Sequence, residues 1–174
     1  DTSVTYAPES STHESCTIYY FDDGIRHEVK GNRGSWSLSA EVGQIPILTF
    51  SMIGIFASPA DVSLGAVTEQ NQAAPVLFKN GNTTSFEIFG FAGALQSYSF
   101  DCNNESVYRE LVGGTKEVLI TDRKPGGSMT IEAVSLSDHN FFTDATGSST
   151  GSNDFQHGQT AGNICTFSCP QTDI

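Results

Sequence analysis

The chain has 174 residues, enough for one domain with a hydrophobic core, and its 20 Asp and Glu against eight Lys and Arg give a formal net charge of −12. This charge argues against tight binding to nucleic acid or to an anionic membrane, because both interactions need cations. Twelve Phe and five Tyr exclude a disordered chain. The longest apolar run, 45–57, is shorter than the roughly 20 residues of a membrane-spanning helix.

The first part of the chain predicts a β-hairpin. Segments 17–21 and 25–29 are rich in β-branched and aromatic residues, which favour strands. Asp23 and Gly24 stand between them, and Asp-Gly supplies the positive φ angles of a two-residue hairpin turn. A second turn is predicted at 31–34, where two glycines flank Asn and Arg.

The next segments predict a half-buried strand, a central strand and a long loop. Apolar and polar residues alternate over 36–42, so one face of this strand is expected in the core. The nearly continuous apolar run 47–56 predicts a central strand covered on both faces. Segment 57–75 contains prolines and a polar run, and we expect an irregular loop of functional length there.

The second half of the chain continues as short strands, with one helix. The helix is predicted at 137–145, with Ser137 or Asp138 as its N-cap, and a flexible linker is predicted at 147–153. Segment 107–112 fits either a turn or a strand, and a loop at 122–127 is expected to join the two strands beside it. The predicted strands are 76–79, 85–89, 95–100, 117–121, 128–133 and 164–169.

About nine short strands at close spacing indicate the fold class. We expect an all-β protein, mainly an antiparallel β-sandwich or a partly closed barrel, with one short flanking helix near residues 137–145. The absence of internal repeats fits a single domain.

Four cysteines allow free thiols or disulfides. On a strand, Cys165 and Cys169 share one face about 13 Å apart, too far for the roughly 7 Å limit of a disulfide. Cys16 and Cys102 are isolated, and they lack the close pairing typical of a zinc site. We therefore expect buried free thiols, with one or two disulfides as the alternative.

The sequence contains no motif that predicts catalysis, a metal or a cofactor. Its four histidines are scattered, and neither a nucleophile elbow nor a glycine-rich phosphate loop is present. We therefore predict no catalytic residue, no metal and no cofactor. A hydrolase with a carboxylate pair stays open, because sequence cannot show which of 20 acids lie close in space.

The charge distribution suggests an acidic face. No Lys or Arg follows Lys124, whereas four of the acidic residues beyond it are Glu132, Asp138, Asp144 and Asp154. One explanation is a solvated surface that keeps copies of the protein apart. The other is a face that stays negative for a purpose, such as letting a polyanion slide past without sticking.

Three segments between Cys16 and Glu132 resemble the tail tube (major tail) proteins of long-tailed bacteriophages. They are Tyr19-Tyr20-x-x-Asp23-Gly24 followed by Gly31-x-Arg33-Gly34, then Ile45-Pro46-x-Leu48-x-Phe50-x-x-x-Gly54, and the closest one, 118–132. None of these motifs is catalytic.

The resemblance implies a β-sandwich with a flanking helix that forms hexameric rings, stacked into a hollow tube for genome delivery. It further implies a place in the virion tail, assembly in the host cytoplasm, contacts with neighbouring tail proteins, no membrane insertion, and DNA that passes without tight binding. The acidic residues named above are then candidates for the lumen face. The candidate turn and assembly residues are Asp23, Gly24, Arg33, Gly34, Asp122, Arg123, Pro125 and Gly126.

Family members of this kind are usually longer at the front. We therefore expect 1–174 to be a single tail-tube-like domain, from the C-terminal portion of a longer or processed precursor. The alternative function is a secreted β-sandwich that binds carbohydrate or a cell surface, with oxidised cysteines. Tyr19, Tyr20 or Trp36 would then stack on the ligand, although their place on alternating strands favours the core.

Overall fold

The structure is a computed structural model that describes residues 3–65, 68, 73–147 and 149–174. Strands dominate it, as the alternation predicts. In chain order the elements are β1 (Cys16–Asp22), β2 (Ile25–Glu41), β3 (Ile47–Asp61), β4 (Thr83–Ile88), β5 (Leu95–Asp101), β6 (Asn104–Arg109), β7 (Glu117–Arg123), β8 (Gly126–Ile131), α1 (Phe141–Gly147), β9 (Gly151–His157) and β10 (Cys165–Thr172).

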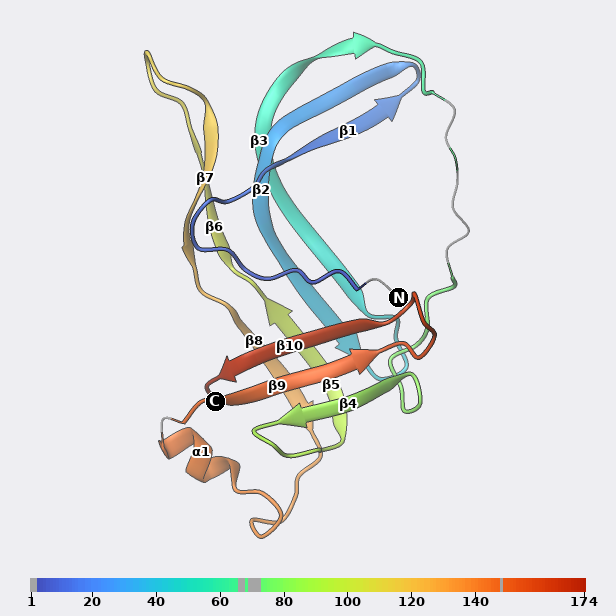
Figure 1. The fold of residues 1–174 in the computed structure, drawn as a ribbon, viewed down its shortest axis with the longest axis vertical. Helices are drawn as coiled ribbons and strands as arrows, with labels where there is room; N and C mark the ends of the chain where they lie inside the picture. The colour runs from blue at the N-terminus through green and yellow to red at the C-terminus, as the bar shows by residue number, and fades with distance from the viewer. Residues whose placement is uncertain (1–2, 66–67, 69–72, 148) are drawn as a thin grey trace.

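Two antiparallel sheets form a sandwich in the lower half of Figure 1. The larger sheet has the order β1-β2-β5-β8, with β3 also paired to β2, and the smaller has the order β10-β9-β4. Strands β6 and β7 form a separate two-stranded hairpin beside β2 and β3. The all-β prediction is confirmed in its sandwich form, because the sheets stay open and none closes into a barrel.

The hydrophobic core lies between the two sheets, at the end of β2 that pairs with β5. Ala40, Tyr98 and Phe155 are almost fully buried there together with Phe78, which belongs to the segment before β4. The Tyr98 ring contacts the Phe155 ring with 5.1 Å between centroids, in the edge-to-face arrangement that aromatic pairs prefer. This core covers only part of the larger sheet, so β1, most of β3 and the first half of β2 extend beyond it (Figure 1).

Strand β2 runs through the position where a second turn was predicted, so that prediction is wrong. Gly31 has φ of +60°, and the pairing of β2 with β3 shifts between Lys30 and Arg33, which marks a β-bulge. The buried Asn32 side chain donates hydrogen bonds to the carbonyl oxygens of Val29 and Cys16. These bonds replace contacts that the bulge removes from the ladder, so the strand continues for 17 residues.

Strand β3 is an edge strand, which corrects the prediction of a central strand covered on both faces. It pairs only with β2 among the described residues. Phe50 and Phe56 are 65% and 76% exposed, because the smaller sheet does not reach them. β3 also runs on to Asp61, so the predicted loop starts later than residue 57, and its residues 66–67 and 69–72 lie outside the described residues.

Segment 76–79 is not a strand. Phe78 instead forms two backbone hydrogen bonds with the turn after β2. Its carbonyl oxygen accepts from the Gly43 N–H at 2.9 Å, and its N–H donates to the Gln44 carbonyl oxygen at 2.8 Å. The undecided segment 107–112 belongs in part to β6. Strands β7 and β8 exist as predicted, but they belong to different sheets, so the chain between them crosses over instead of closing a hairpin.

The predicted helix starts later than 137, and the predicted linker is partly a strand. The Ser135 hydroxyl donates to the Asp138 carboxylate at 2.7 Å and holds 135–138 in a turn. Asn140 then caps α1, since its side-chain oxygen accepts from the Thr143 N–H at 3.2 Å. Residue 148 of the expected linker lies outside the described residues, and β9 begins at Gly151.

Candidate functional site

The part of the larger sheet beyond the core, here called the arm, comprises residues 16–34 and 50–61. Among the described residues, its outer strands β1 and β3 each pair only with β2, so both outer edges can accept a further strand. Neighbouring residues of a strand point to opposite faces, and Tyr19 and Tyr20 are 52% and 62% exposed, so both faces of β1 are open to solvent, whereas the β6–β7 hairpin packs beside β2 and β3. The large hydrophobic residues exposed on the arm are Ile18, Tyr19, Tyr20, Phe21, Ile25, Phe50, Met52, Ile53 and Phe56.

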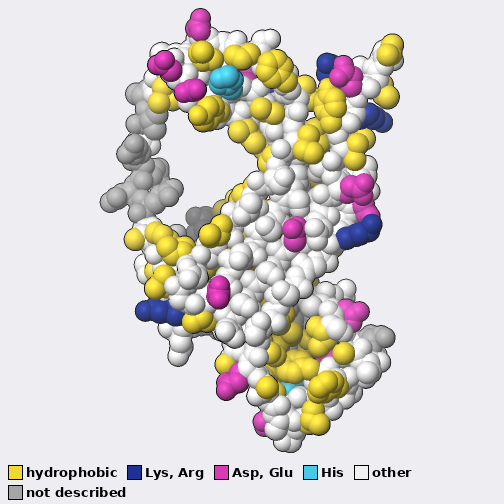
Figure 2. Space-filling view, turned by 180° about the vertical axis from the view of Figure 1, so that it is seen from behind, with side chains coloured by type: hydrophobic (Ala, Val, Ile, Leu, Met, Phe, Trp, Pro, Cys, Tyr) yellow, Lys and Arg dark blue, Asp and Glu magenta, His cyan; other side chains and the backbone are white. Residues whose placement is uncertain are grey.

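These tyrosines correct the expectation that the strand aromatics lie in the core. Of the three aromatic residues considered for ligand stacking, only Trp36 packs inside the sandwich, with its ring 5.2 Å from that of Phe100. Figure 2, seen from behind, shows hydrophobic side chains over the upper part of the molecule, where the arm lies.

Two of the predicted turn residues do form the arm's hairpin turn. Asp23 and Gly24 have φ of 43° and 83°, the two positive values that a two-residue hairpin turn requires. Gly34 lies in β2 instead, facing β3 at very short range. A Cβ atom at Gly34 would lie 2.0 Å from the Ser51 carbonyl oxygen, so only glycine allows this approach.

The two predicted arginines fasten the segment before β1. This segment, residues 3–15, has neither helix nor strand. The Arg33 guanidinium donates to the carbonyl oxygens of His13 and Val118, and its Nε donates to that of Glu14 at 3.3 Å. Arg123 donates to the carbonyl oxygen of Glu9. Both side chains thus join the N-terminal segment to β2 and to the β6–β7 hairpin, a role that turn chemistry does not indicate.

The other predicted turn residues lie where the chain crosses from β7 to β8. The Asp122 carboxylate lies 2.9 Å from Lys124 Nζ, and this hydrogen bond holds the pKa of Asp122 below its usual range. Pro125 follows, and Gly126 opens β8 opposite Asp101 on β5. The crossing therefore sits at the junction of the hairpin and the sandwich.

The four predicted lumen acids come from four different places. Glu132 follows β8, Asp138 lies in the turn before α1, and Asp154 lies on β9 opposite Glu87 of β4. Asp144 is on α1, and its carboxylate lies 2.7 Å from Nε2 of His139. No single element presents the four together, and whether they face a bore stays a prediction.

All four cysteines are described and all are free thiols, but only in part as predicted. Cys102 is buried and Cys169 half-buried, whereas Cys16 and Cys165 are exposed. Burial raises the pKa of both Cys102 and Cys169, which border a cavity of about 830 Å³ between the sheets. These two thiols therefore stay protonated at neutral pH, unlike an activated nucleophile.

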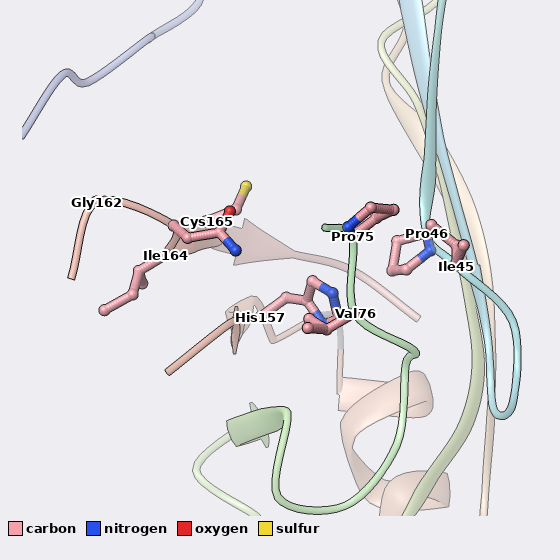
Figure 3. Close-up of a pocket in the computed structure, with 9 residues that line it drawn as sticks. Ile45, Pro46, Pro75, Val76, His157, Gly162, Ile164 and Cys165 are labelled. Atoms are coloured by element: carbon pink, nitrogen blue, oxygen red, sulfur yellow. The ribbon is translucent and has the colours of Figure 1, made fainter. Parts of the chain in front are cut away.

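A smaller pocket of about 290 Å³ brings a histidine and a thiol into one neighbourhood (Figure 3). Nδ1 of His157 already lies 2.9 Å from the Thr83 hydroxyl. The sulfur of Cys165 is directed away from the His157 ring, so the two do not form a nucleophile and base pair (Figure 3). The remaining walls are mostly apolar, formed by Ile45, Pro46, Pro75, Val76 and Ile164.

Metal-binding and membrane-crossing features were sought in the same part of the chain. Within residues 3–65, 68, 73–147 and 149–174, no three His, Cys, Asp or Glu side chains are placed to hold a metal ion. No helix formed by these residues is both long and apolar enough to cross a membrane.

Comparison with known proteins assigns the family. A sequence model described as phage tail tube protein matches residues 1–173. The chain belongs to the phage tail tube protein family. This family is structural and not enzymatic, so the tail tube protein is a structural component of the virion. Its β-rich fold and exposed arm are consistent with this role. No curated protein and no solved structure matches the chain.

Sequence reasoning missed several strongly exposed apolar residues of this tail tube protein. Phe50 and Phe56 were expected inside, and segment 107–112, which includes Leu111 and Val112, was expected to be a turn or a strand with no functional role. The turn carried a detectable signal, since Leu111 and Val112 precede Gly113 and Gly114 where polar residues are usual.

Proposed function

We propose that six copies of this tail tube protein form a ring, and that rings stack into a hollow tube that conducts the phage genome into the host. The exposed apolar arm carries this proposal. A monomer with two free strand edges and uncovered aromatic residues tends to associate, because both features are satisfied by another chain.

The arm suits the interface that a ring requires. Ring closure needs a heterologous contact, in which one patch meets a different patch on the next copy. The free edge of β3 can extend a neighbour's sheet through backbone hydrogen bonds, while side chains such as Phe56 are buried by the same contact. Burying one such side chain stabilises an interface by about 1.5–3 kcal/mol before ordering costs.

The proposed lumen is acidic. Glu132, Asp138, Asp144 and Asp154 lie beyond the last Lys or Arg of the sequence, Lys124. Carboxylates repel DNA phosphates over a screening length of about 8 Å at physiological salt. A bore lined in this way keeps DNA mobile, so the genome passes without tight binding. Assembly is proposed to occur in the host cytoplasm, with neighbouring tail proteins at both ends of the tube.

Native mass spectrometry and electron microscopy of the purified protein test the ring. We expect a species near six times the chain mass of 18.6 kDa, and tubes at higher concentration. Phe56→Ser should abolish both. Phe142→Ser is the matched control, because Phe142 on α1 is 75% exposed against 76% for Phe56, but lies outside the arm. A protein that stays monomeric at all concentrations contradicts the proposal.

A second experiment tests the lumen. Asp144→Lys combined with Asp154→Lys should slow DNA ejection from assembled phage, because two cations per copy attract the passing phosphates. An ejection rate equal to that of the parent phage removes these residues from the lumen.

The alternative function, a secreted carbohydrate- or surface-binding module, has less support. The family assignment is to a structural virion component, and the four thiols are unpaired instead of oxidised.

A further inference from the structure

We propose that the turn of the β6–β7 hairpin inserts into an apolar pocket of a second copy in the adjacent ring, and that this contact joins successive rings. The inference rests on the proposed tube and adds to it a specific axial contact. The pocket is lined by the apolar residues Val42, Ala94, Leu95 and Ile131 together with the polar residues Glu41, Gln96 and Glu132.

The hairpin turn is built to present apolar side chains. The Gly114 N–H donates to the Leu111 carbonyl oxygen at 3.0 Å, and Gly113 has φ of 78°, which together define a type II turn. Val112 therefore occupies the outermost corner and is fully exposed, while Leu111 beside it is 54% exposed. Such corners usually carry polar residues, Gly or Pro, so an exposed apolar pair, Leu111 and Val112, is unusual at this position.

The pocket can receive this turn. It has a volume of about 490 Å³ and lies where the ends of β2 and β8 meet the start of β5. Val42 is 51% exposed at its edge. The backbone around it is fixed by two hydrogen bonds, from Val42 N–H to Gln96 and from Glu132 N–H to Ala94, at 3.0 and 2.9 Å. The site is thus an ordered apolar depression that another chain can fill.

The charges of the two surfaces favour their contact. Residues 104–124 carry four Lys and Arg and four Asp and Glu, so the hairpin is neutral within a chain of net charge −12. At the turn itself, Lys116 pairs with Glu110 at 2.7 Å. The lining of the pocket includes two carboxylates, those of Glu41 and Glu132. A neutral element that bears half of the chain's cations can approach this acidic pocket without the repulsion that two acidic surfaces would meet.

The two surfaces lie far apart along the longest axis of the molecule, which is vertical in Figure 1. The β6–β7 turn is at the top, whereas β8 ends and β5 begins in the lower half, with α1 and the chain before it further down. A contact between one end of a copy and the other end of the next is heterologous and continues without closing, which is the geometry of a stack. The hairpin also carries the Lys and Arg side chains visible along one edge of Figure 2.

Val112→Asp tests the contact without disturbing the fold, because the Val112 side chain is fully exposed in the monomer. We expect rings of unchanged mass, and a critical concentration for tubes raised at least about tenfold, since a carboxylate cannot enter an apolar pocket. The matched control is Val4→Asp, another exposed valine, which should assemble like the parent. An unchanged unfolding midpoint verifies that the variant folds.

Cross-linking identifies the partner surface. Val112→Cys and Ala94→Cys are combined in a chain whose exposed thiols are removed by Cys16→Ser and Cys165→Ser. Oxidation of assembled tubes with diamide should give a ladder of covalent oligomers, and Val112→Cys alone should not, because the turn meets the pocket and not another turn.

The outcomes separate this inference from the proposed tube. Tubes that form normally with Val112→Asp, or tubes of the double-cysteine chain that give no ladder, overturn the axial contact and leave the ring proposal intact. A parent protein that forms neither rings nor tubes overturns the proposed assembly, and the axial contact with it.

Discussion

The strongest test of the core is the substitution Tyr98→Phe. Asn153 is 3% exposed, and its side-chain N–H donates to the Tyr98 hydroxyl at 3.1 Å. Its side-chain oxygen has no hydrogen-bond partner among the described residues. Tyr98→Phe keeps the ring, which packs on Phe155 and Phe167 at 5.1 and 5.4 Å between centroids, and removes only the acceptor. The Asn153 amide then remains buried with neither end bonded by the protein.

The expected loss follows from that unpaired amide. Leaving a buried donor unsatisfied costs about 1–3 kcal/mol, and the ring leaves no cavity behind, so we expect a free energy of unfolding lower by about 2 kcal/mol. Replacing both partners by apolar groups of similar shape is nearly neutral. Adding Asn153→Leu to Tyr98→Phe should therefore restore most of the lost stability.

Urea unfolding of the monomer measures both effects. Trp36 is the single tryptophan, and it packs on Phe100 in the same core, so its fluorescence reports the transition. The samples are kept below the concentration at which the protein associates. A Tyr98→Phe variant within about 0.5 kcal/mol of the parent, or a double variant less stable than either single one, would refute the reasoning.

Three further predictions follow from the same structure. Gly34→Ala should lower the free energy of unfolding by about 1–3 kcal/mol because its Cβ meets the Ser51 carbonyl oxygen, whereas Gly65→Ala, with nothing within 4 Å, should change it by less than about 0.5 kcal/mol in urea titrations. Burial raises the pKa of Tyr98 above its ordinary value of 10.0, so the stability that the neutral hydroxyl contributes is present below pH 10 and is lost above it. The urea midpoint of unfolding should therefore fall less between pH 10 and 11.5 for Tyr98→Phe than for the parent. In a thiol titration of the native monomer with a disulfide reagent, Cys16 and Cys165 should react first and Cys102 last, and equal rates for all four would contradict their burial.

The strands of the sandwich could be predicted because their pattern is local. On β5, Tyr98 is buried between the more exposed Ser97 and Ser99, and this alternation is visible in the sequence. The hairpin turn at Asp23-Gly24 was predictable for a similar reason, since its positive φ angles depend on the two residues that adopt them.

The bulge of β2 and the start of β9 could not be predicted, because partners far along the chain decide them. Gly31 and Asn32 fit a turn as well as a bulge, and pairing with both β1 and β3 selects the bulge. Gly151 was assigned to a flexible linker. In the structure, a Cβ atom at Gly151 would lie 2.6 Å from the Phe89 ring, so glycine is needed for strand packing at this point.

The error on β3 has a different origin, and it bears on the candidate site. The apolar run 47–56 signals that both faces of the strand are covered, but it carries no information on which chain supplies the cover. The smaller sheet of the same chain ends before Phe50 and Phe56, so their exposure measures the cover that the monomer lacks. Exposed apolar side chains on an edge strand favour association with another chain. The burial that the sequence predicts for this strand and the exposure found in one chain are consistent if further copies complete the arm, which is what the proposed ring provides.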